Sequence, residues 1–260
     1  MGTLDGKVAL VTAGTGGIGR GIAEALLAEG ASVVMTGRSA DKGANALAEI
    51  GLPDRTAFLT GDARERDEVA GWVSGAVEAF GRLDILVNNA GGSDGFAPVH
   101  ELSDEAWDNA FTFIVDSAFW ATRAALPVML GNGGGRVINV SSVEGKMGNK
   151  AAVSHYISAK HAMNGFTKAV AFEYGQQGIT SNAICPGAVE TERTKEIGPA
   201  FAAENGLTYD EFLADYAKDA ATGRLNTVEE VGAMAVLLAG PAGAGITGAL
   251  LNVDGGTSPY

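Results

Sequence analysis

The chain has 260 residues, 46% of them hydrophobic, and a formal net charge of -13 at pH 7. This acidity argues against nucleic acids and anionic membranes as partners, because both require a basic face, and it disfavours an acidic carrier protein. A single cysteine, Cys185, allows no internal disulfide. We therefore expect one cytoplasmic domain over residues 1–260, with no leader segment and neither nucleic acid nor membrane as a partner.

The first half of the chain alternates between short apolar runs and helical patterns. Runs rich in β-branched residues predict strands at 7–12, 32–36, 58–60 and 83–87. Helices are predicted from the glycine-rich turn after the first strand to Gly30, over 40–50, and in a segment that ends near residue 79. Each predicted strand is therefore followed by a helix in this half.

The second half continues the alternation. Ser103 is predicted to cap a long helix, residues 137–140 form a buried central strand, and a further helix begins at about residue 152. Strands are predicted at 179–184 and 248–253, and capping boxes at Thr208 and Thr227 indicate the starts of two late helices. Strands that alternate with helices predict a single doubly wound α/β domain whose parallel sheet has about seven strands.

A cluster of glycines, Gly14, Gly16, Gly17 and Gly19, lies between the first strand and the first helix. Such glycines allow the backbone to approach a pyrophosphate, and the helix N-terminus offers it aligned N–H groups. A glycine cluster can also be only a loop, but its position between a strand and a helix favours dinucleotide binding.

The end of the second strand indicates which dinucleotide is bound. An acidic side chain there would accept a hydrogen bond from the ribose of NAD, whereas a 2′-phosphate favours arginine. This chain has Gly37 and Arg38 at that point. We predict NADP, with NAD as the alternative if Arg38 is only an exposed arginine.

Three side chains form a candidate proton-transfer site. Ser142 follows the central strand, and Tyr156 and Lys160 lie four residues apart on the next helix, so they share one face. The ammonium of Lys160 is expected to move the pKa of the phenol from ~10 toward ~7, which is worth about 4 kcal/mol. The alternative is that Tyr156 and Lys160 merely cover a helix surface.

These motifs together resemble the short-chain dehydrogenase/reductase family over essentially the whole chain. The resemblance rests on the turn from Thr12 to Gly19, Asp62, the Asn-Asn-Ala-Gly of residues 88–91, Ser142 with Tyr156 and Lys160, Pro186-Gly187 with Thr191, and the closing Asn-Val-Asp-Gly-Gly. It implies a Rossmann-type fold and hydride transfer between NADP(H), or NAD(H), and a secondary alcohol or ketone.

The resemblance also implies roles for individual residues. Tyr156 would be the general acid or base, Ser142 would hold the substrate oxygen, and Lys160 would bind the nicotinamide ribose. The cofactor site would comprise Thr12, Gly14, Thr15, Gly17, Ile18, Gly19, Arg38, Asp62, Ala63, Asn89, Ala90, Gly91, Tyr156, Lys160, Pro186, Gly187, Val189 and Thr191.

The sequence departs from the family pattern in three places. Ala13 stands where the family usually has glycine, and alanine is not expected to adopt a positive φ easily. Ile114 occupies the position of an asparagine that completes a proton relay in the family. The segment between Ser142 and Tyr156 is one residue longer than expected.

Residues 192–222 are expected to form a lid over the substrate. Its apolar side chains, among them Phe201, Tyr209, Phe212 and Tyr216, either line a pocket for an apolar carbonyl compound or pack the lid onto the body or a second subunit. No metal site is expected, because three histidines and one cysteine are scattered. The resemblance implies a homotetramer, and Ile114 leaves a non-catalytic dinucleotide sensor or scaffold as the rival function.

Overall fold

The fold is known from a computed structural model, which describes residues 2–258 apart from the side chains of Arg193 and Ile197. Within that range one parallel sheet has the strand order β3-β2-β1-β4-β5-β6-β7. The strands are β1 (Val8–Val11), β2 (Ser32–Gly37), β3 (Thr56–Thr60), β4 (Ile85–Asn88), β5 (Gly135–Val140), β6 (Ile179–Pro186) and β7 (Leu250–Val253). The strand order reverses at β1 and β4, so a crevice for a ligand is expected beyond the carboxyl ends of these two strands.

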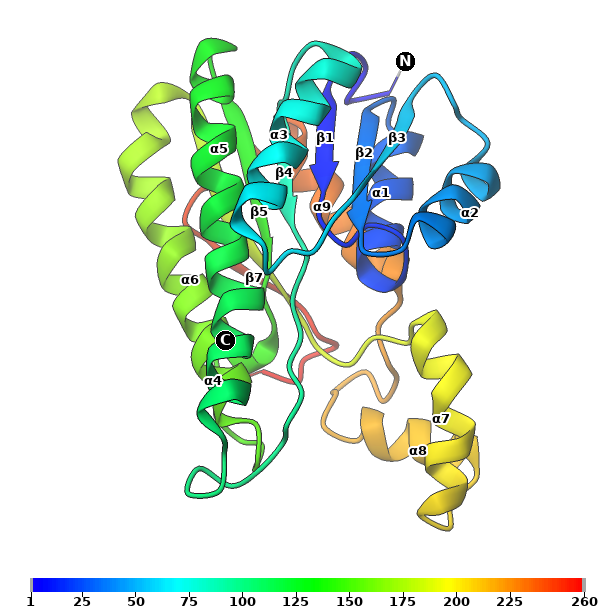
Figure 1. Ribbon diagram of the computed structural model, residues 1–260. Helices are drawn as coiled ribbons and strands as arrows, with labels where there is room; N and C mark the ends of the chain where they lie inside the picture. The colour runs from blue at the N-terminus through cyan, green and yellow to red at the C-terminus, as the bar shows by residue number, and fades with distance from the viewer. Residues whose placement is uncertain (1, 259–260) are drawn as a thin grey trace.

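Helices cover both faces of this sheet (Figure 1). One face carries α1 (Gly17–Ala28), α2 (Ala40–Ile50) and α9 (Val228–Ala239), and the other carries α3 (Arg66–Phe80), α5 (Ser117–Gly131) and α6 (Ser154–Tyr174). Two further helices, α7 (Glu192–Glu204) and α8 (Tyr209–Ala217), lie beyond the carboxyl ends of the strands in Figure 1. The predicted doubly wound α/β fold is confirmed.

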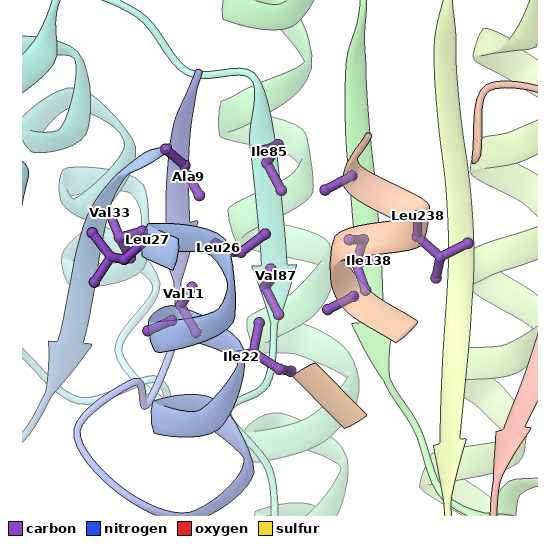
Figure 2. Packing of buried hydrophobic residues seen from close by; sticks show 14 of the residues in the cluster. Ala9, Val11, Ile22, Leu26, Leu27, Val33, Ile85, Val87, Ile138 and Leu238 are labelled. Carbon is purple, nitrogen blue, oxygen red and sulfur yellow. The ribbon is translucent and has the colours of Figure 1, made fainter. Parts of the chain in front are cut away.

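The hydrophobic core between the sheet and helices α1 and α9 fixes the position of α1. Figure 2 shows Ile22 and Leu26 of α1 on the side of the helix that faces the two central strands, with Leu27 beside Val33 of β2. These side chains are 3% exposed or less. Burying each contributes roughly 1.5–3 kcal/mol, so α1 and the glycine-rich turn that precedes it are held firmly against β1.

Most predicted elements are confirmed, with small shifts at their ends. The helix over 40–50 has the predicted bounds, and Thr208 and Thr227 form capping boxes with Glu211 and Glu230. The third strand is longer than predicted and the first and last are shorter. Helix α7 was not predicted as an element, although Thr191 caps it with Thr194. Gly198 and Pro199 interrupt its helical pattern, which explains the omission.

The predicted long helix consists of three pieces. It begins as α4 (Asp104–Phe111), continues through a π-helical turn (Thr112–Asp116) and ends as α5. By length and composition alone the run Asp104–Gly131 could cross a membrane, with a hydropathy of 1.3. Here, however, its buried residues Ala121 and Met129 pack against the sheet. The helix is part of the core that supports the site.

The segment expected to form the lid, residues 192–222, is held together by its own aromatic residues. Phe212 of α8 lies 5.7 Å from Phe201 of α7, 6.2 Å from Tyr209 and 5.5 Å from Tyr216, measured between ring centroids. Phe201 and Tyr216 remain 54% and 53% exposed. The lid aromatics therefore pack chiefly on one another, and two of them keep an exposed face toward solvent.

Candidate active site

The glycine-rich turn forms a cradle for a pyrophosphate at the N-terminus of α1. Gly16 precedes the helix without any side-chain cap, and the first turn has no acidic residue. A Cβ on Gly19 would lie 2.4 Å from the Ala13 carbonyl and the Asn89 amide, so only glycine fits there. N–H groups that the N-cap residue leaves free and a closely approachable backbone are what a dinucleotide phosphate requires. The glycine-rich turn therefore fits a pyrophosphate.

Ala13 does adopt a positive φ, contrary to the expectation from its side chain. Its φ is 50°, in the left-handed region. Two hydrogen bonds fix this conformation: Ala13 N donates to Thr36 Oγ1 at 3.3 Å, and Asn89 Nδ2 donates to the Ala13 carbonyl at 3.1 Å. The turn thus keeps its shape because its surroundings offset the strain of the alanine.

Hydrogen bonds of Thr12 and Asn89 hold the glycine-rich turn in place. The Thr12 hydroxyl accepts hydrogen bonds from the backbone N–H groups of Asn89 and Ala90, both at 2.9 Å, and Asn89 Nδ2 also donates to the Thr12 carbonyl at 3.0 Å. The Asn89 amide nitrogen is therefore committed to the turn, which leaves its oxygen for a ribose. Thr12 is 3% exposed and acts on a cofactor through the backbone it positions.

Arg38 and Asp62 lie where the adenosine end of a dinucleotide is expected. Arg38 is exposed at the end of β2 and has no hydrogen bond or ion pair within residues 2–258. Asp62 is held by Arg64 through Nη2–Oδ2 at 2.6 Å and Nε–Oδ1 at 3.1 Å. Hydrogen bonds from Arg64 hold the pKa of Asp62 below its usual value, with smaller help from the charge of Arg38. The cation of Arg38 thus remains available to an anion.

The segment after β6 reaches back to the glycine-rich turn. Gly187 lies so close to Asp254 that a Cβ would come within 2.9 Å of its Cα, and Thr191 Cγ2 would lie 3.6 Å from a Cβ on Gly17. The carboxylate of Glu192 accepts a hydrogen bond from Gly17 N at 2.9 Å. An anionic side chain of the lid thus occupies one of the N–H groups expected to bind the cofactor pyrophosphate.

Ser142, Tyr156 and Lys160 converge at the end of β5, as predicted. Ser142 Oγ accepts a hydrogen bond from Glu144 N at 3.1 Å, which fixes the hydroxyl at the start of the following loop. Lys160 is 4% exposed, donates to the Val140 carbonyl at 2.8 Å, and lies 5.6 Å from the centroid of the Tyr156 ring. The structure therefore brings the three predicted catalytic side chains together.

The pKa of Tyr156 moves in the direction opposite to the one expected. Burial raises it, interaction with the Ser142 hydroxyl lowers it in part, and the charges of Glu144 and Tyr216 raise it further. Burial also lowers the pKa of Lys160 to about 8. The predicted lowering of the Tyr156 pKa is wrong for this structure. The ammonium of Lys160 is directed at the Val140 carbonyl, and the desolvation of the phenol outweighs the influence of that ammonium.

Ile114 lies beside the lysine, in the π-helical turn. It is fully buried and packs with Ala159, Met163 and Tyr156. A Cβ on Gly91 would lie 3.4 Å from both Ile114 Cγ1 and Lys160 Nζ, which places the apolar side chain next to the ammonium. π-helical turns recur at functional sites. This one places the hydrocarbon side chain of Ile114 where the family has an asparagine, and a hydrocarbon cannot form a hydrogen bond to water.

Sequence reasoning missed the polar groups that support the site. Asn88 Nδ2 donates to Asn139 Oδ1 at 2.8 Å and to Thr122 Oγ1 at 3.1 Å, and Asn139 Nδ2 donates to Thr167 Oγ1 at 2.8 Å. This chain of buried hydrogen bonds links β4 and β5 to α5 and α6, the elements that carry the catalytic residues. Asn88 belongs to the Asn-Asn-Ala-Gly motif, but its supporting role could not be predicted from sequence, because only the strand register brings it beside Asn139.

Together, the fold and the site define a dinucleotide-binding dehydrogenase. The comparisons agree. The model of the short chain dehydrogenase family matches residues 7–201. The chain is 39% identical to a D-beta-hydroxybutyrate dehydrogenase of Cupriavidus necator, over 97% of this chain and 98% of that protein. It is 36% identical to a 3beta-hydroxysteroid dehydrogenase of Mediterraneibacter gnavus, over 100% of this chain and 98% of that protein.

A solved structure is similar over its whole length. A variant of actinorhodin polyketide ketoreductase, crystallised with NADPH, superposes with a TM-score of 0.91 at 36% identity and full coverage of both chains. The chain therefore belongs to the short chain dehydrogenase family and is an oxidoreductase that acts between hydroxyl and carbonyl groups with a nicotinamide cofactor.

Proposed function

We propose that the chain is an NADP-dependent reductase of ketones, or dehydrogenase of the corresponding secondary alcohols, for small or medium-sized apolar substrates. The observation that carries this proposal is the convergence of Ser142, Tyr156 and Lys160 at the carboxyl end of β5. A bound cofactor supplies or accepts the hydride. The residues of the chain must therefore position the carbonyl group and move one proton.

Each of the three residues has one task in this mechanism. Ser142 Oγ donates a hydrogen bond to the substrate oxygen, and Tyr156 donates its phenolic proton to that oxygen as the carbonyl carbon gains the hydride. The raised pKa keeps Tyr156 protonated at neutral pH, the form that reduction needs. Lys160 carries a positive charge below about pH 8, which stabilises the phenolate that remains. Alcohol oxidation reverses the proton transfer.

The cofactor preference rests on Arg38. Its guanidinium is exposed and has no ion pair within residues 2–258, and a Cβ on the preceding Gly37 would lie 3.4 Å from Thr15 Oγ1, so the end of β2 lies close to the glycine-rich turn. A planar guanidinium there suits a 2′-phosphate. The similar ketoreductase was crystallised with NADPH, which supports the same preference. NAD is the alternative, and it would be favoured if Arg38 did not contact the nucleotide.

One experiment tests both the activity and the cofactor. Purified protein is assayed for oxidation of NADPH and of NADH with a panel of neutral ketones. We expect turnover with NADPH, and we expect Arg38→Asp to weaken NADPH binding at least about tenfold more than NADH binding. Arg66→Asp, at a 65% exposed side chain, is the matched control and should affect both cofactors equally. Tight cofactor binding without any turnover would instead support the rival function, a non-catalytic dinucleotide sensor or scaffold.

We also propose a cytoplasmic homotetramer. The exposed Phe119 of α5 and Phe172 of α6, the latter 91% exposed, support assembly through these two helices, because an interface that buries them removes their apolar surface from water. Light scattering should give four times the monomer mass of 26.4 kDa. Phe172→Glu should reduce that mass, and Phe201→Glu in the lid should not.

A further inference from the structure

A buried carboxylate lies beside the catalytic residues and takes no part in the proton transfer. Glu144 is 4% exposed and follows Ser142 by two residues, and its backbone N–H is bonded to the Ser142 hydroxyl. Glu144 Oε1 contacts Lys150 Nζ at 3.1 Å. No residue in the range 2–258 donates a hydrogen bond to Oε2. A buried carboxylate with one undonated oxygen is only partly compensated, so its negative potential extends into the neighbouring site.

The surroundings of this carboxylate place it on the substrate side of the site. The charge of Glu144 and that of Tyr216 in the lid both raise the pKa of Tyr156. Lys150 Nζ lies 6.0 Å from the centroid of the Tyr216 ring, which connects the Glu144–Lys150 pair to α8. A carbonyl group held by Ser142 and Tyr156 therefore has Glu144 at its flank and the lid above it.

We propose that Glu144 selects the substrate by charge: its buried carboxylate repels substrates that carry a carboxylate near the reacting carbonyl, so the site favours neutral carbonyl compounds. This inference rests on the proposed ketone reduction. Lys150 is 55% exposed, so solvent screens its charge more than that of the buried Glu144, which keeps the site unfavourable for anions.

The inference separates this chain from one of its relatives. The relative from Cupriavidus necator is named for hydroxybutyrate, which is a carboxylic acid. In this chain such a substrate would bring its anionic carboxylate close to a second, buried carboxylate with little water between them. Two like charges in a poorly solvated site repel strongly. We therefore expect a neutral ester of acetoacetate, the keto acid that corresponds to hydroxybutyrate, to be a better substrate than acetoacetate itself.

The test compares acetoacetate with its ethyl ester, in the presence of NADPH or NADH, by the ratio of their kcat/KM values. We expect the wild type to prefer the ester at least about tenfold, and Glu144→Gln to reduce this preference by about tenfold, chiefly because turnover of acetoacetate increases. Lys150→Met, which removes the counter-charge and keeps Glu144, should increase the preference. Glu144→Asp, which keeps the charge, should retain it.

The outcomes distinguish this inference from the proposed function. Turnover of both compounds with the same ratio in the wild type and in Glu144→Gln, or a wild-type preference for acetoacetate, would contradict the inference alone. Failure of the wild type to oxidise either cofactor with either compound would contradict the proposed function and the inference with it. If Glu144→Gln does not fold, the Lys150→Met ratio decides, since a decrease or no change would overturn the charge argument.

Discussion

Replacement of Ala13 by glycine should stabilise the protein, although the same replacement almost anywhere else would not. Ala13 has a φ of 50°, and a non-glycine residue in the left-handed region costs about 1–2 kcal/mol. Glycine removes this cost, but it gives the unfolded chain about 0.4–1 kcal/mol more conformational entropy. It also removes a partly buried methyl group that contributes less than about 0.8 kcal/mol. The net expectation is a gain of roughly 0.5 kcal/mol.

Thermal unfolding at fixed protein concentration measures this effect. A gain of that size raises the Tm of a domain of this length by about 1–2 °C. Ala44→Gly is the matched control, because Ala44 is exposed on the right-handed helix α2 and its replacement should cost about 1 kcal/mol. The two variants should therefore shift Tm in opposite directions. A decrease for Ala13→Gly as large as that for Ala44→Gly would show that the turn carries no such strain.

Three further predictions concern the cofactor and the lysine. Glu192→Gln should tighten NADPH binding by roughly twofold to fivefold, since the lid carboxylate no longer opposes an anion at Gly17 N; unchanged or weaker binding in a fluorescence titration would refute this. The folded-state pKa of Lys160 is about 8, below its ordinary value of 10.5, so the unfolded chain binds more protons between these pH values. The free energy of unfolding of the wild type should therefore increase by about 3 kcal/mol relative to that of Lys160→Met as pH rises through that window. A difference between the two proteins that does not change with pH would argue against the shift. Ile114→Asn should move the alkaline limb of the pH–rate profile upward by easing the desolvation of Lys160, whereas Ile114→Val should leave that limb in place.

The sequence was sufficient for features that depend on local chemistry. Capping boxes at Thr208 and Thr227 were read correctly because a cap involves residues three apart. The strand–helix alternation predicted the sheet, since β-branched runs and amphipathic patterns differ in period. The meeting of Ser142 with Tyr156 and Lys160 followed from the order of these elements.

Features that depend on distant parts of the chain could not be predicted in the same way. The positive φ of Ala13 is imposed by Thr36 of β2 and by Asn89, which follows β4. The direction of the pKa shift of Tyr156 depends on burial and on Glu144 and Tyr216, so the i,i+4 spacing to Lys160 was a poor guide. Burial of Glu144 likewise becomes evident only once the loop after β5 is folded.

The most direct test of the account replaces Tyr156 with phenylalanine. Steady-state oxidation of NADPH is measured with a ketone that the wild type reduces, and NADPH affinity is measured separately. Loss of the phenolic proton donor should lower kcat by about 100-fold or more while the affinity for NADPH stays within about threefold. A variant that retains wild-type kcat would contradict the assignment of Tyr156 as the group that moves the proton, and with it the catalytic site described above.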